Sequence, residues 1–171
     1  MMNYEKYIGV IENFPKEGIS FKDVSPLLSD GEVLHQAIDD MSAIINEWHP
    51  DLIIGPEARG FVFGAPIAYK LKVGFAMARK KGKLPGDVIS KTYTLEYNST
   101  TIELKKGLIK PGAKVVLVDD LLATGGTLRA VQELVEDCGG KVVGILTFIE
   151  LNELSGYRVL KEAPYRSILR L

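Results

Sequence analysis

The apolar positions of the chain follow two patterns, a helical spacing and short continuous runs. Between residues 29 and 48 they recur at steps of three and four, which is the period of a helix. These positions are Leu34, Ile38, Met41, Ile45 and Trp48. Ser29 and Glu32 have the spacing of a capping box, so we expect this helix to begin at Ser29.

Short apolar runs predict the strands of a buried sheet. The predicted strands are 51–55, 73–77, 114–118, 142–148 and 165–171. Helix-like segments alternate with them, and the helix predicted over 127–138 ends at Gly139 and Gly140, a common C-terminal signal. Strands that are apolar on both faces and alternate with helices indicate an α/β doubly wound domain with a mostly parallel sheet. The length of 171 residues fits one domain.

The segment from Arg79 to Gly112 interrupts this alternation. It opens with four cations within five residues, and apolar residues then alternate on both sides of a turn near Asn98, as in a β-hairpin. A long insertion between two core strands is often an active-site lid. We therefore expect residues 79–106 to form a lid outside the core, with a solvated surface hairpin as the alternative.

Composition limits the kind of partner that the chain binds. The 21 Lys and Arg against 22 Asp and Glu give a formal net charge of −1, which argues against nucleic acid and anionic membranes. No apolar run has the length of a membrane span or a signal sequence, so the expected location is cytoplasmic. Cys138 is the only cysteine, and His35 and His49 do not have metal-ligand spacing. A small-molecule ligand is therefore expected.

The run VVLVDDLLATGGT, residues 115–127, carries the strongest chemical signal. Its last part opens a predicted helix, whose N-terminal N–H groups suit a phosphate. The expected phosphate loop is Ala123, Thr124, Gly125, Gly126 and Thr127. Asp119 and Asp120 would repel a phosphate unless they bind ribose hydroxyls or the water shell of Mg²⁺. The pattern thus indicates a phosphorylated pentose, and a plain helix cap is the alternative.

On these residues the chain resembles the type I phosphoribosyltransferases. The segments 14–28, 55–64 and 79–97 are similar to the members of that family that act on adenine. The resemblance implies one domain over residues 1–171, with a hood at about 1–30 and the hairpin as a lid. It also implies transfer of the phosphoribosyl group from 5-phosphoribosyl 1-diphosphate to adenine, giving AMP and pyrophosphate, with Mg²⁺ as cofactor and a homodimer as the assembly.

The resemblance assigns binding roles to two further groups of residues. Pyrophosphate is expected to bind Glu57, Ala58, Arg59, Arg79, Lys80 and Lys83. These residues combine backbone N–H groups at a helix start with side-chain cations, both of which suit an anion. Adenine is expected to stack on Phe21 and to meet backbone groups of Ser20 and Lys22.

The catalytic residues that we expect are Glu96, Asp119 and Asp120. The aspartates are expected to fix the ribose and to hold Mg²⁺ through its waters, with no direct protein ligand to the metal. Glu96 points away from the face that Leu95 and Tyr97 share, so it is expected to approach the purine when the lid closes and to assist proton transfer. Glu103, on the far arm of the hairpin, is expected to matter little.

Two other functions are compatible with some of the same sequence features. Because the donor motif does not specify the base, a phosphoribosyltransferase for xanthine or hypoxanthine is the first alternative. The second is a non-catalytic regulator that senses phosphoribosyl diphosphate and binds nucleic acid. The near-neutral charge and the intact pyrophosphate segment argue against the regulator.

Overall fold

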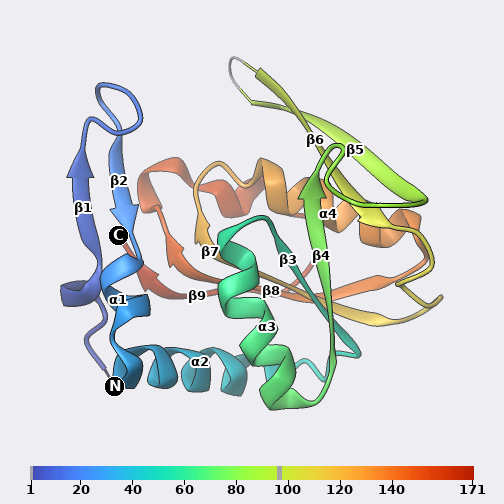
Figure 1. Cartoon of the computed structure of the whole chain (residues 1–171), viewed down its shortest axis with the longest axis horizontal. Coiled ribbons are helices and arrows are strands. Elements are labelled where there is room, and N and C mark those ends of the chain that lie inside the picture. Colours follow the sequence, from blue (N-terminus) through green and yellow to red (C-terminus); the bar gives the residue numbers. More distant parts are fainter. Residues whose placement is uncertain (1, 96–97) are drawn as a thin grey trace. The chain divides into compact units, whose positions relative to one another are not determined.

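The computed structural model describes residues 2–95 and 98–171 (Figure 1). The chain divides after Asp40 into two compact units. The elements of the first unit are η1 (Glu5–Tyr7), β1 (Gly9–Glu12), β2 (Ser20–Asp23), α1 (Ser25–Ser29) and the first part of α2 (Gly31–Asn46). β1 and β2 form an antiparallel hairpin, and the ring of Phe21 meets that of Phe14 edge-on at 5.2 Å. This hairpin was not predicted from the sequence.

The N-terminus of α2 is capped by Asp30 and not by Ser29. The Oδ1 atom of Asp30 accepts hydrogen bonds from the N–H groups of Glu32 and Val33, both at 3.1 Å. Ser29 instead ends the short helix α1, where its hydroxyl donates to the carbonyl of Pro26. The predicted capping box is therefore wrong, because the aspartate next to it accepts from two amides of the first turn at once.

The second unit contains a seven-stranded sheet in the order β5-β6-β4-β3-β7-β8-β9. The strands are β3 (Leu52–Pro56), β4 (Gly74–Lys80), β5 (Val88–Leu95), β6 (Asn98–Lys105), β7 (Lys114–Leu122), β8 (Lys141–Glu150) and β9 (Tyr165–Arg170). β4, β3, β7, β8 and β9 are parallel to one another, and β5 and β6 form an antiparallel hairpin at one edge (Figure 1). This confirms the predicted α/β fold with a mostly parallel sheet.

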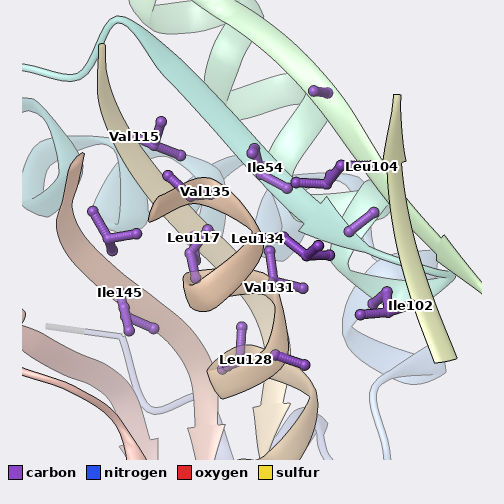
Figure 2. Packing of buried hydrophobic residues seen from close by; sticks show 14 of the residues in the cluster. Ile54, Ile102, Leu104, Val115, Leu117, Leu128, Val131, Leu134, Val135 and Ile145 are labelled. Atoms are coloured by element: carbon purple, nitrogen blue, oxygen red, sulfur yellow. The ribbon is translucent and has the colours of Figure 1, made fainter. Parts of the chain in front are cut away.

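Two helices cover the two faces of this sheet, α3 (Arg59–Leu71) and α4 (Gly126–Asp137). α4 turns one apolar stripe onto side chains from several strands (Figure 2). The labelled members of this cluster on α4 are Leu128, Val131, Leu134 and Val135. Neighbouring strand residues point to opposite faces, so Ile54 and Leu117 meet α4 while Ile53 and Val116 face the other side. There Phe63 of α3 stacks on Phe148 at 5.4 Å.

The base of the hairpin belongs to the core, which corrects the expectation that the whole segment lies outside it. β6 pairs with β4, with Arg79 opposite Glu103 and Lys80 opposite Ile102. Ile102 and Leu104 are 3% and 2% exposed and pack in the cluster under α4 (Figure 2). The alternation of apolar residues was read correctly as a hairpin, but it also builds one wall of the core. A lid can therefore comprise only the distal hairpin, that is, the part of the hairpin nearest to its turn.

The remaining elements are the 3₁₀ helices η2 (Asn152–Leu154) and η3 (Gly156–Val159), between β8 and β9. None of the described helices is both long enough and apolar enough to cross a membrane.

Candidate active site

A pocket of about 250 Å³ opens at the carboxyl ends of β3 and β7. Residues 57–59 and 119–128 line it. The predicted phosphate loop, the two aspartates and the first predicted pyrophosphate segment thus share one cavity. In parallel α/β sheets, ligands bind at this end of the strands. Arg79, Lys80 and Lys83 are not among the described residues that line the cavity.

The phosphate loop ends where α4 begins. Gly125 precedes the helix with φ at +82°, a left-handed conformation that favours glycine. Because Gly125 has no side chain to cap the first turn, the N–H groups of that turn remain available to an anion. The partial positive charge of the twelve-residue helix adds to this attraction.

The back of the phosphate loop rests on η3. A methyl group added to Gly125 would overlap the carbonyl oxygen of Gly156, and one added to Gly156 would overlap the carbonyl oxygen of Ala123. Only glycine fits at either position. Gly156 was not predicted from the sequence, because a single glycine in an irregular segment gives no local sign of what it contacts.

Asp119 and Asp120 lie within β7 and not beyond it, because β7 continues to pair with β8 as far as Leu122. Asp120 is 2% exposed, and its Oδ2 atom lies 3.0 Å from Nε of Arg59. That ion pair is close, yet Oδ2 of Asp120 accepts no hydrogen bond among the described residues. The N–H of Asp120 donates to Oδ1 of Asp119 at 2.9 Å. Both aspartates line the cavity, so their carboxyl groups can serve as acceptors for a ligand there.

Burial disfavours the ionised forms of both carboxyl groups. Burial raises the pKa of Asp119, and the neighbouring charge of Asp120 raises it further. Burial also raises the pKa of Asp120, although the guanidinium of Arg59 opposes that rise. Two adjacent carboxylates with raised pKa values in a cavity are typical of a functional site.

Glu57 connects the cavity to the basic segment. Its Oε2 atom accepts hydrogen bonds from the N–H of Lys80 at 2.9 Å and from Nε of Arg79 at 3.1 Å. Burial alone would raise the pKa of Glu57, but these two hydrogen bonds outweigh burial and lower the pKa. Glu57 was expected to bind pyrophosphate. Its contacts point instead to fixing the end of β4, and a direct role stays a prediction.

The basic turn after β4 is held from two sides. Nη1 of Arg79 donates to the carbonyl of Lys83 at 3.2 Å, and the N–H of Gly82 donates to Oε2 of Glu103 at 3.0 Å. Glu103 is only 5% exposed. Glu103 was expected from the sequence to matter little, whereas in the structure it anchors this turn.

The residues expected to bind adenine lie in the first unit. Ser20, Phe21 and Lys22 belong to β2, where Nζ of Lys22 lies 3.1 Å from the hydroxyl of Ser20 and that hydroxyl donates to Glu12. Their role toward the base stays a prediction. Glu96 lies outside the described residues, so its role is also untested.

The chain is similar to known proteins over nearly its whole length. The family described as a phosphoribosyl transferase domain matches residues 28–169. An adenine phosphoribosyltransferase of Clostridium perfringens is 52% identical over 168 residues, 98% of each chain.

Two crystal structures extend the likeness to the fold. The adenine phosphoribosyltransferase of Thermoanaerobacter pseudethanolicus has a TM-score of 0.95 at 44% identity, covering 98% of this chain and 97% of the other. The Saccharomyces cerevisiae enzyme, complexed with an imino-altritol bisphosphate and adenine, has a TM-score of 0.93 at 37% identity over 96% of both chains. With the cavity described above, this identity over the full length shows that the chain belongs to the adenine phosphoribosyltransferases of the phosphoribosyltransferase family.

Proposed function

We propose that this chain transfers the 5-phosphoribosyl group of phosphoribosyl diphosphate to adenine in purine salvage, releasing AMP and pyrophosphate. The observation that carries the proposal is the single cavity in which residues 123–127, the two aspartates and Arg59 meet. Such a cavity suits a ligand with a phosphate, a diol and a second anionic group. Adenine as the acceptor is supported by the relatives, whose named activity uses that base.

Each part of the cavity is assigned to one part of the donor. The loop 123–127 binds the 5-phosphate through backbone N–H groups and threonine hydroxyls. Asp119 and Asp120 accept hydrogen bonds from the ribose hydroxyls. Ala58 and Arg59 bind the diphosphate. Arg79, Lys80 and Lys83 approach the same group from the end of β4. In the first unit, Phe21 stacks on the base while Ser20 and Lys22 read its edge.

The reaction breaks the bond between C1′ of the ribose and the diphosphate and forms a bond between C1′ and N9 of adenine. N9 loses its proton in this step, and Glu96 is the residue proposed to assist that loss. Negative charge develops on the leaving diphosphate and positive charge on the ribose ring. Arg59 and the basic turn stabilise the first, and the aspartate pair stabilises the second. Closure of the distal hairpin excludes water, which would otherwise capture the ribosyl cation.

The aspartate pair fits Mg²⁺ that is held mainly by ligand oxygens and water. Mg²⁺ in proteins commonly uses one or two carboxylates together with substrate phosphates, and Oδ2 of Asp120 accepts no hydrogen bond from the described residues. When bound, the metal adds positive charge near the leaving diphosphate. Asp119 and Asp120 would hold its water shell.

We also propose that the chain works as a cytoplasmic homodimer. α3 exposes Val62 and Tyr69, which are 41% and 88% accessible and lie seven residues apart on one helical face. Met77 of β4 is a further exposed apolar side chain, at 42%. A second copy would cover these side chains. The cytoplasm is proposed because a donor with a phosphate and a diphosphate is too highly charged to cross a membrane unaided.

The substrate assignment predicts a strong preference among bases. With phosphoribosyl diphosphate and Mg²⁺ present, adenine is expected to release pyrophosphate far faster than hypoxanthine, xanthine, guanine or uracil. Equal or faster turnover of a 6-oxopurine would reassign the acceptor while leaving the donor site intact. Binding of phosphoribosyl diphosphate without turnover of any base would favour the non-catalytic regulator.

The lid assignment predicts a defect in chemistry for Glu96→Gln. If this carboxyl group assists proton transfer at the purine, the variant is expected to lower the single-turnover rate with adenine by about 10²- to 10⁴-fold. The affinity for phosphoribosyl diphosphate is expected to stay nearly unchanged. The matched control is Glu162→Gln, at an exposed glutamate, because Glu103 is buried and anchors the basic turn. A wild-type single-turnover rate in Glu96→Gln would contradict the role in proton transfer, and the lid would then serve only to exclude water.

A further inference from the structure

A side chain of the hairpin contacts the phosphate loop directly. The hydroxyl of Tyr93 in β5 lies 2.8 Å from the hydroxyl of Thr127, and either atom can be the donor. The two residues are 34 positions apart in the chain, and both are partly buried. The Tyr93 ring packs against the cluster under α4, so its position is fixed by the core and not by the hydroxyl contact.

A second contact fastens the same strand to the same helix. Lys91 lies two residues before Tyr93, so both side chains leave one face of β5. Nζ of Lys91 lies 2.9 Å from Oε2 of Glu133 and 3.7 Å from Oδ2 of Asp137. Thr127 is in the first turn of α4, whereas Glu133 and Asp137 are further along. β5 therefore follows α4 over most of its length, with one contact on the phosphate loop and another remote from it.

The role of the contact between Tyr93 and Thr127 depends on which hydroxyl donates the hydrogen bond. A threonine hydroxyl has a single proton to donate. A phosphate oxygen is an acceptor only, so the hydroxyl of Thr127 must donate its one hydrogen bond to the phosphate. The hydroxyl oxygen of Thr127 can then accept a hydrogen bond from another donor. A phenol is a stronger hydrogen-bond donor than an aliphatic alcohol. Tyr93 is therefore suited to donate to Thr127 while Thr127 donates to the phosphate.

We propose that Tyr93 is a positioning residue that fixes the hydroxyl of Thr127 as a donor to the 5-phosphate of the substrate. The proposal rests on the assignment of residues 123–127 as the phosphate site. It gives β5 a function beyond carrying the lid, because the strand that leads to the distal hairpin also completes the phosphate site. Thr127 keeps its place in the loop without Tyr93, but its hydroxyl loses a fixed orientation.

The test is the affinity for ribose 5-phosphate, measured by calorimetry without turnover. Tyr93→Phe removes only the phenolic oxygen and is expected to raise the dissociation constant by about 3- to 10-fold, the range of one hydrogen bond between neutral groups. In kinetics the same factor is expected in KM for phosphoribosyl diphosphate, with kcat and KM for adenine unchanged. Wild-type affinity in this variant would overturn the proposal.

A double-mutant cycle separates positioning from a general loosening of the strand. Thr127→Val is expected to weaken ribose 5-phosphate binding at least as much as Tyr93→Phe, and the double variant is expected to be no weaker than Thr127→Val alone. Additive losses would mean that Tyr93 does not act through Thr127.

The matched control is Lys91→Met, which removes the other contact between β5 and α4 and is expected to leave the dissociation constant unchanged. An equal loss in Lys91→Met would assign the effect to docking of the strand and would also overturn the proposal. The calorimetric comparisons of all these variants remain interpretable if adenine is not the acceptor, because they do not require turnover.

Discussion

Asp120→Asn is expected to lower kcat/KM for phosphoribosyl diphosphate by about 10²- to 10³-fold, the loss typical of one preorganised electrostatic group. Asparagine has the same shape but no charge. It keeps the packing of a side chain that is 2% exposed, and it removes the negative charge that we propose to lie next to the developing ribosyl cation. Steady-state kinetics over a range of donor concentrations would measure the loss, with Asp87→Asn, at an exposed aspartate, as the control.

The same substitution is expected to leave the melting temperature at pH 7 unchanged or higher. Burial raises the pKa of Asp120 even with Arg59 beside it, so the ionised form destabilises the folded state. Removing the charge removes that cost. Arg59 loses its partner, but its side chain is 41% accessible and can be hydrated. A large fall in melting temperature, together with lost activity, would show that the carboxylate is structural.

The stability gain should depend on pH in a definite direction. Because the pKa of Asp120 is higher in the folded chain than in the unfolded chain, its contribution to stability is fully present below the unfolded value, about 3.9 for aspartate, and is lost as pH rises through the folded value. The variant should therefore gain at neutral pH and lose that advantage in acid. Thermal unfolding of both proteins across this range would test it.

The sequence predicts the centre of this molecule better than its edges. The runs that became β3, β7 and β8 are apolar on both faces, so they mark buried strands without reference to the rest of the chain. The ends of these strands cannot be predicted in the same way. β7 extends past Val118 because Asp119 and Leu121 pair with β8, and that pairing joins residues almost thirty positions apart. A local pattern contains no information about such a partner.

The same limit explains what was missed in the site. The loop 123–127 was predicted because its glycines and threonines are consecutive and open a helix. Gly156, and the supporting contacts of Glu57 and Glu103, involve residues far away in the sequence. A buried glutamate in an alternating strand looks like an exposed one until its partner, the N–H of Gly82, is known.

Gly156→Ala is expected to raise the dissociation constant for ribose 5-phosphate by about 10-fold or more, although Gly156 does not line the cavity. The added methyl group would overlap the carbonyl oxygen of Ala123, so either η3 or the phosphate loop must move. Overpacking of this kind typically costs about 1–3 kcal/mol of stability. Because the loop is proposed to bind the phosphate through converging backbone N–H groups, a small shift would misalign several hydrogen bonds at once.

Alanine variants of two more glycines distinguish the effect of steric overlap from that of backbone strain. Gly107 has φ at +81° with open space around it, so Gly107→Ala carries only the strain of a left-handed residue, about 1–2 kcal/mol, and should bind ribose 5-phosphate normally. Gly125→Ala combines that strain, at φ +82°, with overlap against Gly156, and is expected to be the least stable and the weakest binder of the three. Calorimetry and thermal unfolding on the same samples would give both quantities. Native affinity in Gly156→Ala would mean that the contact behind the loop does not hold the phosphate site in place.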